Sequence, residues 1–239
     1  MPLAADIADS LTSVRRRIDT AAHRARRAPS DITLVAVSKT FSADNVRLAA
    51  AAGQTVFGEN RVQEGADKAQ QLLGLGLEWH LIGHLQSNKA KRAVASFSWI
   101  ESVDSLELLQ KLDRAATEQR VRPRILIQVD LAHEATKHGA DEARVAELVD
   151  AGLTAASLDL VGLMTVPPIP AQPEDSRPWF RQLRELRDRL VSKGMPAERL
   201  GHLSMGMSHD FEVAIEEGAT IVRVGSSIFG GRPAHAPIA

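Results

Sequence analysis

The stretch that decides the fold is ITLVAVSKTFSADNVRLAAAAGQTVFGE (32–59). Its two ends, ITLVAVSK (32–39) and TVFGE (55–59), are short runs of β-branched and apolar residues, which is typical of buried strands. The segment between them, SADNVRLAAAAG (42–53), predicts a helix with Ser42 as its N-cap and Gly53 as its stop. A strand, a helix and a second strand in this order predict two parallel strands joined by a helical crossover.

The same alternation of strand and helix continues along the chain. Six further strands are expected, at EWHLIG (78–83), WIESV (99–103), RILIQVD (124–130), LVGLMTV (160–166), HLSMG (202–206) and IVRVG (221–225). Eight strands with helices between them predict an α/β fold of the (β/α)8 TIM-barrel type, preceded by an extra amphipathic N-terminal helix. An open doubly wound sheet is the alternative, and the lack of GxGxxG after the first strand disfavours it. No linker is visible, so we predict a single domain over residues 1–239.

Composition excludes several classes of function. The net charge is 29 − 30 = −1, which gives no bulk attraction to nucleic acid or to an anionic membrane. No apolar run approaches the roughly 20 residues that span a bilayer. The chain has no cysteine, which excludes thiolate chemistry and suits the cytoplasm. It also has no tyrosine, a fact that bears on catalysis below.

In a TIM barrel, functional residues belong at the carboxyl ends of the strands. The first predicted strand ends in Lys39, and alternation places this residue in phase with Val35 and Val37. If these valines face inward, the lysine amine lies at the barrel mouth. Partial loss of hydration there lowers its pKa and favours the neutral form, which attacks aldehydes. The alternative is a lysine that simply leaves the barrel for solvent.

The last predicted strand carries Arg223 between Val222 and Val224. If the two valines pack against the outer helices, the arginine points into the barrel. A buried guanidinium requires an acceptor, which is either a structural carboxylate or an atom of a ligand.

Two loops then resemble phosphate-binding turns. They are SMGMS (204–208) and VGSS (224–227), which follow the last two predicted strands. Both provide glycine for close backbone approach and serine hydroxyl groups, and barrels often bind phosphate at these two positions. Ordinary strand-to-helix turns are the alternative.

Other chemistries have weaker support. His80 and His84, or His133 and His138 with Glu134, do not lie on one helix face as metal ligands, so we predict no metal site. No nucleophile-elbow motif accompanies a serine. The strand-terminal carboxylates Glu59 and Asp130 could act as acids or bases, or could cap the helices that follow.

Taken together, several segments resemble those of the pyridoxal phosphate homeostasis protein family. The similar segments are LVAVSKT (34–40), FGENRVQE (57–64), EWHLIGHLQSNK (78–89), GLMTVPP (162–168), LSMGMSHDFEVAIEEGAT (203–220) and VRVGSSIFG (222–230). They occur in the family's order over about 200 residues. The resemblance implies an alanine-racemase-like barrel of fold type III that lacks the racemases' second, C-terminal β-domain.

The resemblance also implies roles for individual residues. Lys39 matches the lysine that holds pyridoxal phosphate (PLP) as a Schiff base, and Arg223 matches the arginine that faces the pyridine nitrogen. The phosphate group is expected at Ser204, Gly206, Gly225 and Ser226. Asn60 matches an asparagine near the cofactor ring, and Met164 is a further candidate for a ring contact.

The implied function is intracellular PLP homeostasis, by a protein that stores or delivers the cofactor and limits free aldehyde. Racemases of this fold resemble one another in using a tyrosine as second base, and this chain has none. We therefore expect a monomeric, non-catalytic carrier, with PLP and PLP-dependent apoenzymes as its partners. An amino-acid racemase and a Schiff-base aldolase barrel are the alternatives, and bound PLP would exclude the aldolase.

Overall fold

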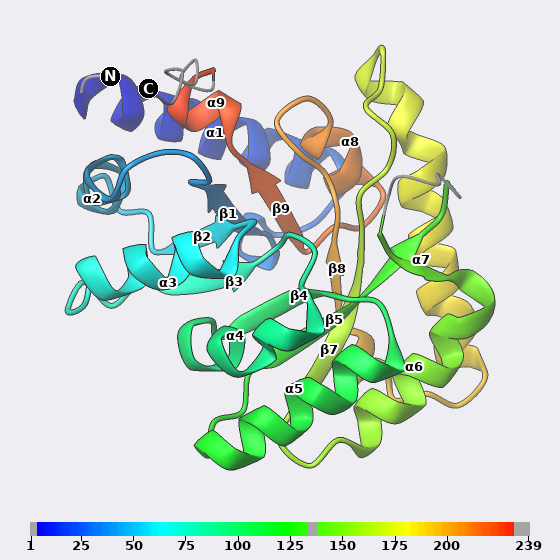
Figure 1. The fold of residues 1–239 in the computed structure, drawn as a ribbon. Helices are drawn as coiled ribbons and strands as arrows, with labels where there is room; N and C mark the ends of the chain where they lie inside the picture. Colours follow the sequence, from blue (N-terminus) through cyan, green and yellow to red (C-terminus); the bar gives the residue numbers. More distant parts are fainter. Residues whose placement is uncertain (1–3, 133–137, 232–239) are drawn as a thin grey trace.

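Eight parallel strands close into a barrel in the computed structural model, which describes residues 4–132 and 138–231 (Figure 1). They are β1 (Thr33–Val37), β2 (Val56–Glu59), β3 (Glu78–Leu81), β4 (Trp99–Val103), β5 (Arg124–Asp130), β7 (Asp159–Thr165), β8 (His202–Ser204) and β9 (Ile221–Val224). The pairings of β1 with β9 and of β4 with β5 complete the ring. The predicted (β/α)8 barrel is therefore confirmed, and the open sheet is excluded.

Helices cover the outside of the barrel (Figure 1). They are α1 (Ala4–Arg24), α2 (Ala43–Ala51), α3 (Val62–Gln71), α4 (Ala90–Ser96), α5 (Leu106–Gln119), α6 (Glu142–Thr154), α7 (Arg177–Ser192), α8 (Phe211–Glu216) and α9 (Ser226–Phe229). Ser42 caps α2 as predicted, because its side chain accepts a hydrogen bond from the Asn45 N–H. Helix α1 packs against α2, α8 and α9 beside the junction of β1 and β9. Within the described ranges, no helix combines the length and apolarity that crossing a membrane requires.

Alternation along the strands separates two apolar layers. The inner layer fills the barrel and consists of Val35, Trp99, Leu126, Val161, Met164 and Ile221. The outer layer packs under the helices and includes Ala36, Val222 and Val224. Val35 therefore faces inward, and the outward direction of Val222 and Val224 turns Arg223 into the barrel, as the sequence predicted.

The structure differs from the predicted strands at four places. Strand β3 ends at Leu81, two residues before the predicted end. Strand β1 ends at Val37, so Lys39 lies in the turn that follows and not on the strand. Strand β8 ends at Ser204, two residues before the predicted end. A short strand, β6 (Ala140–Asp141), pairs with the end of β5 and was not predicted. Two residues are too few to show any periodicity.

Candidate functional site

A cavity of about 340 Å³ opens at the carboxyl ends of the barrel strands. Its lining comes from the segments that follow β1, β2, β3, β7, β8 and β9, and from Val37 on β1 and Arg223 on β9. The lining residues are Val37, Lys39, Phe41, Asn60, Ile82, Val166, Ile169, Pro170, Met207, Ser208, His209, Asp210, Arg223, Gly225, Ser226 and Gly230. The proline-rich segment after β7 contributes Ile169 and Pro170, which places this long loop at the mouth of the barrel.

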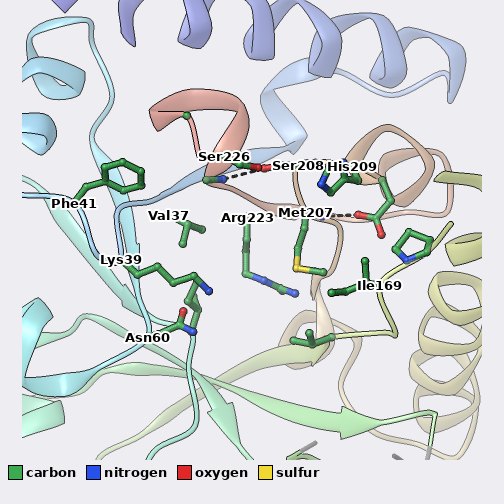
Figure 2. Close-up of a pocket in the computed structure, with 16 residues that line it drawn as sticks. Val37, Lys39, Phe41, Asn60, Ile169, Met207, Ser208, His209, Arg223 and Ser226 are labelled. Atoms are coloured by element: carbon green, nitrogen blue, oxygen red, sulfur yellow. Dashed lines mark hydrogen bonds between the residues drawn. The ribbon is translucent and has the colours of Figure 1, made fainter. Parts of the chain in front are cut away.

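Five of the eight predicted site residues line this cavity: Lys39, Asn60, Arg223, Gly225 and Ser226. Figure 2 shows the side chains of Lys39 and Arg223 extending into the same space, with Asn60 close to Lys39. The other three, Met164, Ser204 and Gly206, are buried and are not lining residues. Met164 belongs to the inner layer of the barrel, and Ser204 lies within β8.

Asn60 is placed at the cavity by a close approach between two strand ends. A Cβ atom on Gly83 would lie 2.4 Å from the carbonyl oxygen of Asn60, which is an overlap with backbone. Only glycine allows the segment after β3 to pass so near the segment after β2. This contact holds the two segments together where Asn60 and Ile82 reach the cavity.

Arg223 lies at the floor of the cavity and is buried. Its guanidinium donates hydrogen bonds to the Ser204 hydroxyl and, at 2.8 Å, to the carbonyl oxygen of Thr165. The nearest carboxylate is that of Glu101, 3.9 Å from the guanidinium. Burial lowers the pKa of Arg223 below its usual value, and the negative charge of Glu101 acts in the opposite direction. The acceptors of the guanidinium are thus a hydroxyl and a carbonyl group of the protein, and the Glu101 carboxylate, at 3.9 Å, acts on it through its charge.

A chain of polar side chains continues from Arg223 through the barrel interior. The Ser204 hydroxyl donates to Glu101, and the other oxygen of Glu101 lies 2.6 Å from Nδ1 of His80. The Nε2 atom of His80 lies 3.1 Å from Glu78, at the beginning of β3 and thus at the opposite end of the barrel. Sequence analysis did not identify Glu101 as part of the site, although an acidic residue within the predicted buried strand WIESV (99–103) was a signal.

In this row of polar side chains, each charged group favours the charged form of its neighbour. Burial alone would lower the pKa of His80, but hydrogen bonds with Glu101 and Glu78 raise it above its usual value. Burial alone would raise the pKa of Glu101, but the hydrogen bond with His80 and the charges of His80 and Arg223 lower it. These partners favour the charged forms of His80 and Glu101, and hydrogen bonds hold the guanidinium at the cavity floor in one position.

The loops after β8 and β9 provide donors for an anion. The backbone N–H groups of Gly225 and Ser227 both point at the hydroxyl oxygen of Ser208, at 3.2 and 3.4 Å. Two amide groups that converge on one oxygen are the arrangement that binds phosphate oxygens in proteins. The part of the first loop that lines the cavity begins at Met207, three residues after the predicted Ser204 and one residue after the predicted Gly206.

The histidines considered as metal ligands have other surroundings. His80 is enclosed by the two carboxylates described above. His84, Asp104 and His138 gather after β3, β4 and β5, with one possible ligand atom each within 4.8 Å of the others. The two imidazole rings, however, stack 3.6 Å apart and 10° from parallel, so no point at coordination distance from both rings lies close to both ring planes. His133 and Glu134 lie outside the described residues.

Comparison with known proteins establishes the family. The sequence model described as "Alanine racemase, N-terminal domain" matches residues 10–233. The "Pyridoxal phosphate homeostasis protein" of Aquifex aeolicus is 44% identical over 224 residues, which cover 94% of this chain and 97% of the relative. The chain belongs to the pyridoxal phosphate homeostasis protein family. The protein of that name from Escherichia coli K12 is 42% identical over 233 residues, 95% of this chain and 97% of the relative.

Solved structures of similar fold include a protein with PLP bound and an alanine racemase. PipY of Synechococcus elongatus, solved with PLP bound, is 40% identical and has a TM-score of 0.82, over 94% of this chain and 100% of PipY. Alanine racemase from Clostridium difficile is 16% identical with a TM-score of 0.74, and the match covers 97% of this chain but 58% of the racemase. That second likeness is one of fold alone. It shows that this pyridoxal phosphate homeostasis family member matches only part of the racemase's length.

Proposed function

We propose that this protein binds PLP in the cavity at the carboxyl ends of the strands, with Lys39 as its covalent anchor. The observation that carries the proposal is that a lysine amine, a buried guanidinium and two converging amide groups line or border one cavity of about 340 Å³. A cavity of this size is ordinary for a small cofactor. PLP supplies an aldehyde that reacts reversibly with amines. Lys39 would hold it by condensation of Nζ with the aldehyde carbon, and water is the leaving group.

The other lining residues fit the remaining parts of PLP. The N–H groups of Gly225 and Ser227, with the hydroxyls of Ser208 and Ser226, suit the phosphate group. Arg223 suits the ring nitrogen as a hydrogen-bond donor, because a guanidinium does not give up its proton. A ring nitrogen left unprotonated makes the cofactor a weaker electron sink, which disfavours transamination.

We infer a carrier rather than an enzyme. In this interpretation residues 1–239 act as one barrel domain, a monomer in the cytoplasm, that stores PLP, limits the free aldehyde and supplies PLP-dependent apoenzymes. The absence of tyrosine supports this interpretation, because the second base of the racemases is missing. An amino-acid racemase is the alternative, and the observation in its favour is His209, an exposed imidazole that lines the cavity.

The test is to add PLP to the purified protein, record the visible absorption, reduce with borohydride and map the modified peptide by mass. We expect one modification, on Lys39, that Lys39→Ala abolishes and Lys91→Ala, at an exposed site on α4, leaves unchanged. A colourless protein that stays unmodified would refute the proposal. Turnover of a chiral amino acid at roughly 1 per second or faster, lost in His209→Asn, would establish the racemase instead.

A further inference from the structure

Helix α3 holds the backbone on both sides of Lys39. The Nζ atom of Lys68 donates a hydrogen bond of 2.7 Å to the carbonyl oxygen of Ser38, the residue before Lys39. Glu64, one turn earlier on the same helix, accepts a hydrogen bond of 2.6 Å from the N–H of Thr40, the residue after Lys39. The two side chains are joined to each other at 2.8 Å. One helix thus contacts both neighbours of the residue to which we assign the cofactor.

Lys68 is buried to a degree that is rare for lysine. Only 5% of the residue is exposed, and its ammonium group has three partners: the Ser38 carbonyl, Glu64 and, at 2.7 Å, Glu59. An ammonium group has three protons to donate, so these contacts use its full capacity. Burial of a lysine is costly unless it is fully paired, so the buried ammonium group depends on these three contacts around the turn.

Lys68 does not act as a second ligand-binding lysine. It is absent from the lining of the cavity that contains Lys39. It borders instead a shallow hollow on the outside of the barrel, shared with Thr40 and Glu64. Whatever Lys68 contributes to the cavity, it contributes through the backbone of the turn.

The turn has an uncommon conformation that needs such support. Thr40 has a φ of +69°, in the left-handed region, which β-branched residues seldom adopt. This conformation is unfavourable for a residue other than glycine, because the Cβ atom comes too close to the following carbonyl oxygen. The turn is closed by a hydrogen bond of 3.1 Å from the Phe41 N–H to the Ser38 carbonyl, the same oxygen that Lys68 contacts. Without α3, the peptide groups on either side of Lys39 lose the contacts that oppose this strain.

A buried carboxylate completes the arrangement. Glu59 ends β2 and receives hydrogen bonds of 2.7 Å from both the Ser38 hydroxyl and Lys68. Its second oxygen is buried and has no hydrogen-bond partner among the described residues. The carboxylate is therefore oriented toward Ser38 and Lys68, and it ties the end of β2 to the same turn.

We propose that Lys68, assisted by Glu64, is a positioning residue that aims the amine of Lys39 into the cavity. This inference rests on the proposed covalent binding of PLP at Lys39. It assigns to α3 a part in the rate at which the amine reacts, separate from the residues that hold the phosphate and the ring. A displacement of the reacting atom by about 1 Å commonly reduces a rate by up to about a hundredfold.

The test compares Lys68→Met with Lys68→Arg in the full-length protein. We expect Lys68→Met to slow borohydride-trapped labelling of Lys39 by PLP at least about tenfold. In the protein without cofactor, trace acetylation of Lys39 should change by a similar factor, since it reports the amine alone. Lys68→Arg keeps a donor and should restore part of both rates. Non-covalent retention of the phosphate-bearing cofactor, measured without reduction, should change little.

Arg27→Met is the matched control. Arg27 is also a long cation that donates to two backbone carbonyl groups, those of Ile215 and Ala219, and it does not line the cavity. It should lower thermal stability and leave the reactivity of Lys39 unchanged. If Lys68→Met fails to fold, Glu64→Ala, at a partly exposed position, tests the same hold on the backbone around Lys39. It should also slow labelling, because Glu64 accepts the hydrogen bond from the Thr40 N–H.

The outcomes separate the two proposals. A folded Lys68→Met or Glu64→Ala variant that labels at the wild-type rate overturns the positioning role. So does an equal loss of labelling in Arg27→Met, because the effect would then follow stability alone. A wild-type protein that is never labelled refutes PLP binding at Lys39 itself.

Discussion

Replacement of Glu101 with glutamine removes the negative charge between Arg223 and His80, with little change in shape. Removal of one partner of a buried ion pair costs about 3–5 kcal/mol, because the other charge remains buried and unpaired. The amide oxygen of glutamine still accepts one hydrogen bond, so we expect a loss near the lower limit, about 3 kcal/mol. In a chain of this length that loss lowers Tm by roughly 6–12 °C. Thermal unfolding followed by circular dichroism measures it.

Glu107→Gln is the control, because Glu107 is an exposed residue of α5 that pairs with Lys111. Exposed ion pairs contribute little, so its Tm should hardly change. The pH dependence provides a second measurement. The raised pKa of His80 gives stability that is complete below about pH 6.5 and is lost as the pH rises through the folded pKa. Glu101→Gln should reduce that loss. Equal changes in Tm for the two variants would refute the reasoning.

Two further predictions concern packing and acid stability. Gly206→Ala should cost about 1–3 kcal/mol more than Gly74→Ala in urea unfolding. Both glycines have a positive φ, of +92° and +95°, but only at Gly206 does an added Cβ overlap another atom, 2.5 Å from Ala214; equal costs would contradict this. Glu217→Gln should make the loss of stability below about pH 4.5 less steep. Burial raises the pKa of Glu217, but hydrogen bonds from Arg181 and Arg177 lower it overall, and the stability that they give is lost as the pH falls through the folded pKa. Acid titrations of equal slope would contradict the second prediction.

The strand pattern was sufficient to predict the barrel and its inward-facing residues. Val35 and Arg223 alternate with outward apolar neighbours, and a period of two is visible within one strand. The polar chain below Arg223 was not predicted, because Glu101 and Ser204 are 103 residues apart and neither strand indicates the other. The predicted end of β8, at residue 206, also lies two residues beyond its observed end at Ser204. The carboxyl end of a strand depends on where pairing stops, which is a property of the neighbouring strands.

The contacts of Lys68 and Glu64 with the backbone on either side of Lys39 were not predicted for the same reason: their partners lie on another element of the chain. A period of 3.6 residues places Glu64 and Lys68 on one face of a helix, where ordinary solvated pairs are common. Nothing in that pattern indicates that the Lys68 ammonium is buried against the turn after β1. For the contact between Gly83 and the Asn60 backbone, the sequence shows a glycine at position 83 but does not indicate which residue lies against it.

The pairing of β1 with β9 has a consequence for synthesis of the protein. Val35 lies opposite Arg223 across this pair, so the two flanks of the proposed cofactor site come from the first and last strands of the barrel. During synthesis on the ribosome, Lys39 is made early. The cavity floor at Arg223 and the N–H groups of Gly225 and Ser227 are absent until β9 has emerged and paired with β1. Ligand that binds only the closed barrel stabilises it by mass action. In this interpretation PLP favours the folded over the unfolded state only of chains whose last strand has been made.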